Sequence, residues 1–393
     1  MSKYTELFKP LTINGFELKN RFVLSPMTLN LTTIDGKMTP QEIAYAKRRA
    51  YSAPLQVTGG AYFDDFGQLF EFGYSAKTDD DIESLTQLAN AMKTKENRVI
   101  LQLAHAGKFA KIALKKFGYT YGPSEEHNNW PFKHDVYEMS IDQIKNVVKA
   151  YSDAAKRAIK AGFNGIEISM AQRLLIQTFF SKIVNKRKDI YSAENFENRS
   201  RLALEIVSSI RDVIDKYAPK DFIFGFRATP EETYGGELGY TIDEFNQLID
   251  SIIEKGKISY LAIASWGHDI YLNKVRSESK HKGELVNKVI YEHVNGRIPV
   301  ISSGGINTPD KCLEAFKYSD LVGLSSVFVA DPEFVQKIEQ NEIEKIELTV
   351  KKEQLAQLAI PENSFAGVVN MFGYCETIPS ETLNILETNA NNK

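Results

Sequence analysis

Short runs of apolar and β-branched residues alternate along the chain with longer segments whose apolar positions recur every three or four residues. The short runs are typical of strands buried in a parallel sheet, and the longer segments are typical of helices that cover such a sheet. The helical pattern is clearest at Ile141–Ala161 and Arg199–Lys216. The eight predicted strands are Phe22–Leu24, Leu55–Thr58, Val99–Leu103, Gly165–Ile168, Phe222–Arg227, Tyr260–Ala264, Pro299–Ser302 and Leu321–Leu324.

Eight strands with helices between them close most economically into a (β/α)8 (TIM) barrel. A doubly wound sheet is the main alternative, but it usually carries fewer strands. We therefore expect a single barrel over residues 1–348 and a C-terminal extension and tail over 349–393. Leu11–Leu18 predicts a hairpin that caps the N-terminal mouth. The long, aromatic-rich loop Phe109–Glu138 after the third strand is predicted to form a lid or substrate wall.

Composition narrows the class of protein. The 393 residues are 43% hydrophobic and 25% charged, with a formal net charge of −3, as in ordinary soluble globular proteins. Because there is no broad basic stripe, nucleic acid is not an expected partner. Two cysteines without metal-binding spacing indicate a reducing cytoplasm. The sequence shows no signal peptide and no apolar run long enough for a membrane span, so a membrane is not an expected partner either.

The polar residues that follow the predicted strands are the candidates for chemistry, since such barrels bind ligands at the C-terminal ends of their strands. They include no paired carboxylates, no Ser-His-Asp arrangement and no cluster of metal ligands. Glycines, hydroxyls, one amide and one arginine suit the binding of a large polar ligand better than hydrolysis. The candidate binding residues are Ser25, Pro26, Met27, Thr28, Gly59, Gln102, Arg227, Ser303, Gly304, Gly305, Ser325 and Ser326.

Three of these positions carry the strongest local signals. Gly304 and Gly305 follow the seventh strand, where barrels often bind a phosphate with backbone N–H groups; a simple tight turn explains them equally well. Arg227 ends an apolar strand, so its charge needs either a bound anion or a neighbouring glutamate. Gln102 lies in another buried strand. Its amide either hydrogen-bonds to the edge of a bound heterocycle or finds its hydrogen-bond partners within the core.

Several motifs occur in the order expected of one family, from about Phe8 to Pro332. They are NRFVLSPMT (Asn20–Thr28), QLAHAGK (Gln102–Lys108), AGFNGIEI (Ala161–Ile168), Asn185–Tyr191, Glu197–Arg199, Gly304–Gly305 and Asp331–Pro332. Together they are specific, and the chain resembles the Old Yellow Enzyme family of NADH:flavin oxidoreductases and ene-reductases.

The resemblance implies FMN bound non-covalently over the barrel mouth, with NADH or NADPH as the hydride donor and an electron-poor alkene as the acceptor. Thr28 would then bond near flavin O4 and N5, and Arg227 would lie near N1 and O2, where negative charge develops on reduction. The remaining ring contacts would come from Pro26, Met27, Gly59 and Gln102, and the phosphate contacts from Ser303, Gly304, Gly305, Ser325 and Ser326.

The chain departs from the family pattern where the acceptor is held. Ser169, Gln172 and Leu174 stand where the family has its histidine, its second histidine or asparagine, and its proton-donating tyrosine. Losing an oxyanion donor costs about 2.7–4 kcal/mol, so we expect slow reduction of ordinary enones. Ser169, Gln172, Thr28 and His268 are the catalytic candidates. Residues that would substitute for the missing groups are Arg173, Tyr62 and His268.

The chain also departs from the family pattern at the predicted phosphate site, where Ser325-Ser326 replaces the family's Gly-Arg after the eighth strand. One lost charge-assisted contact of about 1.5–3 kcal/mol predicts weaker FMN binding. The favoured function is an FMN-dependent oxidoreductase acting on a small electrophilic acceptor. The alternatives are a flavin-binding barrel with little or no turnover and a sugar-phosphate lyase or isomerase, which would need a lysine or paired acids at the strand ends. The resemblance also implies a homo-oligomer, with Phe365–Tyr374 as a candidate contact.

Overall fold

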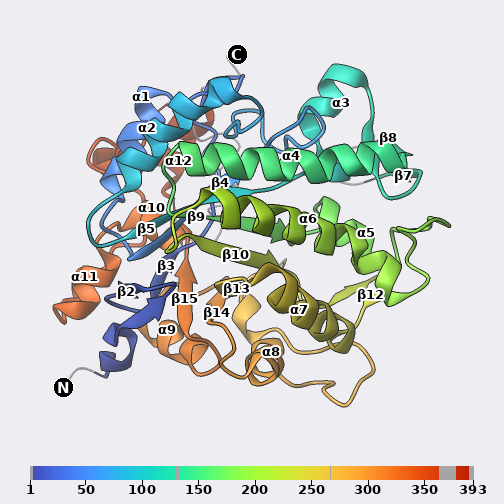
Figure 1. Cartoon of the computed structure of the whole chain (residues 1–393). Helices are drawn as coiled ribbons and strands as arrows, with labels where there is room; N and C mark the ends of the chain where they lie inside the picture. Colours follow the sequence, from blue (N-terminus) through green and yellow to red (C-terminus); the bar gives the residue numbers. More distant parts are fainter. Residues whose placement is uncertain (1–2, 130, 132, 266, 363–377, 389–393) are drawn as a thin grey trace.

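Eight parallel strands close into a barrel that helices surround (Figure 1). The computed structural model describes residues 3–129, 131, 133–265, 267–362 and 378–388. Around the barrel the strands follow the order β10-β13-β14-β15-β3-β4-β5-β9. Their bounds are β3 Phe22–Leu24, β4 Leu55–Ala61, β5 Arg98–Leu103, β9 Gly165–Met170, β10 Ile223–Ala228, β13 Tyr260–Ile263, β14 Val300–Ser303 and β15 Leu321–Leu324. The predicted fold and all eight strands are confirmed, with strand ends that differ by up to three residues.

The outer helices owe their positions to apolar stripes and N-terminal caps. In α4 (Ile141–Lys160) the Ser140 side chain accepts from the Gln143 N–H and the Gln143 side chain accepts from the Ser140 N–H, which is a capping box. The buried face of α4 packs against α6 (Phe196–Tyr217). Other helices are α1 Pro40–Arg48, α2 Ile82–Met92, α3 Lys111–Phe117, α5 Leu175–Phe180, α7 Ile242–Gly256, α8 Val286–Val294, α9 Pro309–Phe316, α10 Ser326–Ala330, α11 Phe334–Glu339 and α12 Ser380–Thr388.

A hairpin closes the N-terminal mouth of the barrel, as predicted. Strands β1 (Leu11–Ile13) and β2 (Phe16–Leu18) pair antiparallel. The turn needs two left-handed residues, which Asn14 (φ 46°) and Gly15 (φ 81°) supply. Ile13 and Leu18 are buried in one cluster with inward-facing barrel residues.

The segment predicted as the long loop 109–138 is more ordered than expected. It contains α3 and a three-stranded sheet of order β6-β8-β7, formed by Thr120–Gly122, His134–Glu138 and Glu126–Asn128. In Figure 1, α3, β7 and β8 lie together at one end of the molecule. Neighbouring rings hold this region, including Phe66 stacked on Phe117 with centroids 5.0 Å apart. Its role as a lid stays a prediction.

The beginning of the C-terminal extension packs on the barrel. Val350, Leu355, Leu358 and Ile360 are buried in a cluster with residues that follow β3. The Arg49 guanidinium, at the end of α1, donates to the carbonyls of Phe328, Val329 and Leu358 and so ties this segment to α1 and α10. The proposed contact Phe365–Tyr374 lies outside the described residues.

One buried carboxyl belongs to helix α1. Glu42 is 1% exposed, and the Tyr74 hydroxyl donates to its Oε1 at 2.7 Å. Among the described residues no group bonds its Oε2. Burial raises the pKa of Glu42 to about 7, against smaller opposing effects of Tyr74 and Arg49. The side chain is therefore held largely as the neutral acid below pH 7.

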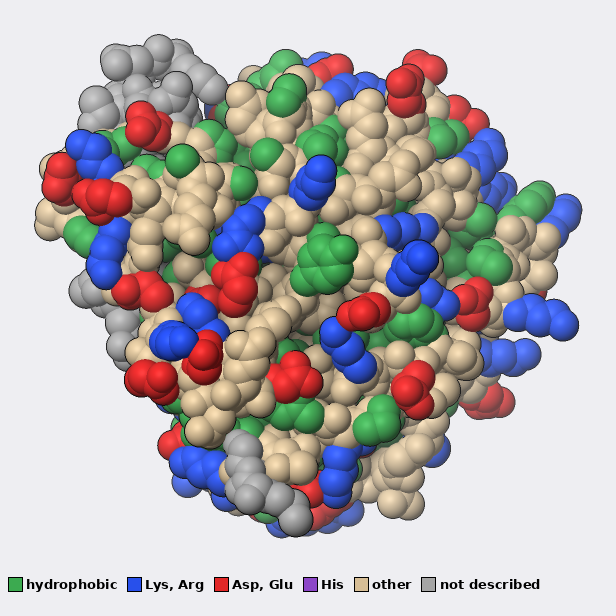
Figure 2. Space-filling view, turned by 90° about the vertical axis from the view of Figure 1, so that its left-hand side faces the viewer, with side chains coloured by type: hydrophobic (Ala, Val, Ile, Leu, Met, Phe, Trp, Pro, Cys, Tyr) green, Lys and Arg blue, Asp and Glu red, His purple; other side chains and the backbone are tan. Residues whose placement is uncertain are grey.

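The surface carries no dominant charge on the face shown in Figure 2, where acidic and basic side chains are interspersed and apolar ones are scattered. No helix in the described part of the chain has the length and apolar character needed to cross a bilayer.

Candidate active site

A glycine loop follows β14 at the C-terminal mouth. Gly304 (φ 93°) and Gly305 (φ 80°) are both left-handed, a conformation that glycine adopts at little cost. A Cβ on Gly304 would lie 2.6 Å from Ile270, and a Cβ on Gly305 would lie 2.6 Å from Asp269 Oδ1. Within the described residues, no backbone acceptor pairs with either glycine N–H. The loop therefore presents backbone donors, as the prediction of a phosphate cradle requires.

The two strand residues predicted to read the flavin ring meet around a carboxylate. Gln102 Nε2 donates to Glu167 Oε1 at 2.7 Å, and the Tyr260 hydroxyl donates to Glu167 Oε2 at 2.9 Å. Arg227 lies beside this group on the neighbouring strand β10, where Gly225 pairs with Glu167. Gly225 must lack a side chain, because a Cβ there would lie 2.2 Å from the Tyr260 ring. The barrel thus places the amide and the guanidinium at one inner surface.

The charges of this cluster depend on each other. Burial raises the pKa of Glu167, and the charge of Arg227 together with the bonds from Gln102 and Tyr260 opposes that rise. Burial lowers the pKa of Arg227, and Glu167 opposes that change. Of the two explanations for Arg227 given by the sequence, a neighbouring glutamate therefore supplies at least part of its counter-charge. The ring-edge roles of Gln102 and Arg227 stay predictions.

The loop after β3 packs directly on β4. A Cβ on Gly59 would lie 2.6 Å from the Met27 carbonyl and 2.7 Å from Thr28 Oγ1. Ser25 donates its N–H to the Leu324 carbonyl at 2.7 Å, which joins this loop to β15. Ser25, Met27, Gly59 and Ser325 line a small cavity of about 40 Å³. These predicted residues are thus brought together, with Pro26 half-buried beside them.

The predicted acceptor-binding residues lie at the end of β9. Ser169 is 4% exposed and pairs in register with Arg227. Gln172 and Arg173 are consecutive left-handed residues, with φ of 58° and 61°. The Gln172 N–H donates to Thr229 Oγ1 at 3.1 Å, while Arg173 lies over the Tyr234 ring at 4.2 Å. Strained backbone of this kind concentrates at functional sites.

Replacing Gln172 with Gly should raise the free energy of unfolding by about 1 kcal/mol, because glycine removes the left-handed strain, and should slow reduction of the acceptor. Urea denaturation and flavin reoxidation rates measure the two effects. Lys257, at the end of α7, is a matched control, since it is also left-handed (φ 46°) and caps an outer helix. Lys257→Gly should gain stability without any change in rate. An unchanged rate in Gln172→Gly would contradict a role for this amide.

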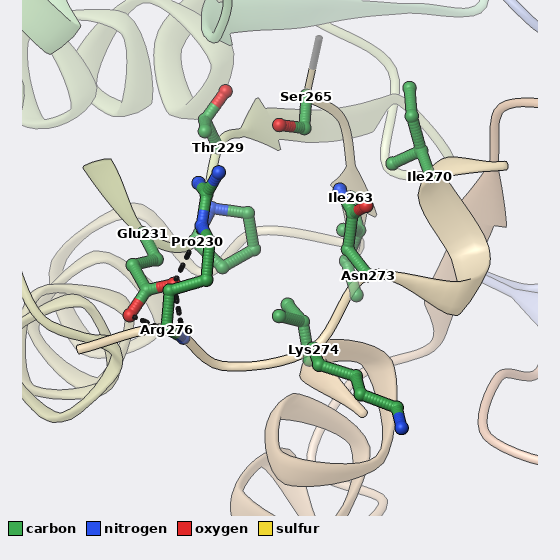
Figure 3. Close-up of a pocket in the computed structure, with 10 residues that line it drawn as sticks. Thr229, Pro230, Glu231, Ile263, Ser265, Ile270, Asn273, Lys274 and Arg276 are labelled. Atoms are coloured by element: carbon green, nitrogen blue, oxygen red, sulfur yellow. Dashed lines mark hydrogen bonds and ion pairs between the residues drawn. The ribbon is translucent and has the colours of Figure 1, made fainter. Parts of the chain in front are cut away.

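A cavity of about 240 Å³ lies between the glycine loop and the predicted acceptor-binding residues at the end of β9 (Figure 3). Thr229 and Ile270 line it, and these residues contact Gln172 and Gly304 respectively. The Arg276 guanidinium points toward Thr229 and Pro230, whereas the Lys274 side chain points away (Figure 3). Glu231 accepts from the Arg276 and Ser277 N–H groups. The cavity therefore has a polar wall with a fixed carboxylate and an accessible arginine.

The remaining predicted residues are more scattered. His268 is exposed, and its carbonyl faces Gly305, so it lies at the glycine-loop side of the mouth. Tyr62 is 8% exposed and donates its N–H to the Tyr74 carbonyl. Ser303 is buried, and its hydroxyl donates to the Ile263 carbonyl at 2.7 Å. Ser325 precedes the short helix α10, and Ser326 begins it.

The residues present fit FMN. An anionic phosphate suits the N–H groups of the two glycines, and a half-buried guanidinium beside an amide suits the polar edge of a flavin ring. The cavity that adjoins the glycine loop lies at the same mouth. The fold and the site together define a flavin-binding oxidoreductase barrel.

Comparisons with known proteins agree. The profile of the NADH:flavin oxidoreductase / NADH oxidase family matches residues 6–345. An uncharacterized oxidoreductase of Streptococcus pyogenes serotype M5 is 48% identical, covering 99% of this chain and 98% of the relative. YqiG of Bacillus subtilis, a probable NADH-dependent flavin oxidoreductase, is 28% identical, covering 95% and 98%. The solved structure of Old Yellow Enzyme from Pichia sp. AKU4542 superimposes with a TM-score of 0.70 at 24% identity, covering 86% of this chain and 87% of that one.

The chain belongs to the NADH:flavin oxidoreductase / NADH oxidase family. The predicted family is confirmed, and with it FMN as cofactor and NADH or NADPH as hydride donor. The protein is therefore an FMN-dependent NAD(P)H oxidoreductase.

Sequence reasoning assigned no role to several residues of the site. Glu167 and Tyr260 complete the cluster around Arg227, and Thr229 anchors the strained turn. Alternate residues of a barrel strand point inward, so Glu167 shares its face with Ser169, and this alternation is the signal that identifies it. No local pattern points to Thr229, because its partner Gln172 comes from a different strand end.

Proposed function

We propose that the protein transfers hydride from NAD(P)H to a small, already electrophilic acceptor held beside Ser169 and Gln172. The observation that carries this proposal is the register of β9 and β10, which puts Ser169 next to Arg227. FMN, when bound, supplies the hydride-accepting and hydride-donating chemistry. Arg227 stabilises negative charge at the ring, while Glu167 and Tyr260 fix the inner surface on which Arg227 lies.

The acceptor must need little activation by the protein. Ser169 and Gln172 donate neutral hydrogen bonds only, and Leu174 is 7% exposed and cannot deliver a proton. An acceptor with strong electron withdrawal of its own requires less stabilisation from oxyanion donors. The alternative of a flavin-binding barrel without turnover predicts that NAD(P)H bleaches the flavin but no acceptor restores its colour.

Ser169→Ala should slow reoxidation of the reduced flavin by its acceptor about 100-fold, as loss of one oxyanion donor does, while reduction by NAD(P)H keeps its rate. Stopped-flow absorbance separates the two half-reactions. Ser152→Ala on α4 is the control, since Ser152 is also largely buried, and its bonds within the described part of the chain are to Ser209 and to its own helix. Equal losses in both half-reactions, or none, would argue against acceptor binding at Ser169.

We further propose that the protein works in the cytoplasm and forms a homo-oligomer. The low cysteine content supports the first point. Sedimentation of the purified protein tests the second, and a monomer at micromolar concentration would contradict it.

A further inference from the structure

A lysine and an aspartate form an ion pair on the glycine loop. Lys311 lies in the first turn of α9, whose N-cap is Thr308. Its Nζ is 3.0 Å from Asp269 Oδ1 and 3.2 Å from the Gly305 carbonyl oxygen. The Asp269 carboxylate in turn rests on the loop, since a Cβ on Gly305 would lie 2.6 Å from its Oδ1. The Lys311 ammonium group and the Asp269 carboxylate therefore both lie against the loop that is predicted to bind the phosphate.

A flavin phosphate needs a positive charge that the loop itself does not provide. A phosphomonoester carries about −1.5 to −2 charges at pH 7. Gly304 and Gly305 offer neutral N–H groups, and Ser325 and Ser326 offer neutral hydroxyls. Lys311 is a cation that bonds this loop directly, through the Gly305 carbonyl. Its flexible four-carbon stem allows the ammonium group to move toward an anion nearby.

Asp269 has the opposite effect on a phosphate. Its side chain is 48% exposed and that of Lys311 is 35% exposed, so water and a ligand reach both. An exposed ion pair of this kind is weakly held, and a dianion competes well with a single carboxylate for the ammonium group. The carboxylate also repels a phosphate directly.

We propose that Lys311 is the cation that binds the FMN phosphate, and that Asp269 is an internal counter-ion which the phosphate displaces. The pair then sets how strongly the protein prefers FMN over riboflavin, which has the same ring and no phosphate. Lys311 stands in for the arginine that Ser326 replaces, but from a different helix.

Titration of flavin-free protein with FMN and with riboflavin, followed by quenching of flavin fluorescence, tests the proposal without any turnover. Lys311→Met should raise the Kd for FMN about tenfold, the lower end for a charge-assisted contact that is partly exposed. Asp269→Asn should lower that Kd several-fold. Neither change should move the Kd for riboflavin, and Lys311→Arg should retain FMN affinity. The FMN affinity of Lys311→Met should also depend less on salt.

Lys288→Met is the matched control and should leave the binding of both flavins unaffected. Lys288 lies on α8 and forms a 2.7 Å ion pair with Glu284, which precedes that helix, at similar exposure. The proposal is overturned if Lys311→Met weakens FMN and riboflavin equally, which would mean a structural role, or if it leaves FMN binding unchanged. It is also overturned if Asp269→Asn weakens FMN binding, an independent result that does not need the lysine variant to fold.

Discussion

Glu167→Gln should lower the free energy of unfolding by about 3 kcal/mol, because it leaves the Arg227 guanidinium inside the barrel without its counter-charge. The amide keeps the volume of the carboxylate but has one acceptor atom in place of two, so the lost charge and the lost bond from Gln102 or Tyr260 act together. We take the lower end of the usual range because Arg227 is only half-buried. Urea denaturation at pH 7 measures the change.

Two further variants separate charge from packing. Arg227→Met combined with Glu167→Gln should lose less stability than Glu167→Gln alone, since no unpaired charge then remains. Glu333→Gln removes a carboxylate from an exposed pair with Arg48 and should change stability by less than about 1 kcal/mol. If Glu167→Gln changes the free energy of unfolding as little as Glu333→Gln does, Arg227 does not depend on Glu167 for its counter-charge.

Glu42→Gln should make the protein more stable than wild type at pH 8 and leave the two equal near pH 4. The folded pKa of Glu42 is about 7 and its ordinary value is 4.5. The neutral acid is therefore favoured by folding, and the stability that it contributes is complete below pH 4.5 and is lost as the pH rises through 7. A shift of this size corresponds to about 3 kcal/mol.

The measured quantity is the difference in unfolding free energy between variant and wild type at each pH from 4 to 9, which cancels the titration of all other groups. Glu83→Gln is the control, since Glu83 is exposed on α2, and its difference should be flat. A flat difference for Glu42→Gln would show that the carboxyl is not held neutral in the folded protein.

Strand positions were predictable because each barrel strand is a short, mainly apolar run that separates longer segments of helical pattern. Phe22–Leu24 and Leu321–Leu324 match β3 and β15 exactly in their bounds. The small sheet within residues 120–138 was missed, since strands such as Glu126–Asn128 are polar and owe their pairing to neighbours rather than to burial. The packing of Val350 and Leu358 under Arg49 was missed because it depends on contacts about 300 residues apart.

The candidate site was likewise predictable only in part. Residues at strand ends, such as Gln102, Arg227 and Gly304, were identified because barrel geometry brings every strand end to one mouth. Contacts between different strand ends, such as Gln172 with Thr229 and Asp269 with Lys311, follow from backbone turns that no local pattern encodes. The left-handed Gln172 and Arg173 were equally invisible, because neither residue type favours that conformation.

Barrel closure has a consequence for synthesis of the chain. Phe22 of β3 pairs with Val322 of β15, which is made 300 positions later. At about 5–20 residues per second, a ribosome delivers the second strand roughly 15–60 s after the first. During that interval one edge of β3 has no partner, and an unpaired edge readily recruits other chains. Until β15 emerges the barrel cannot close, and the free edge of β3 stays open to association with other chains.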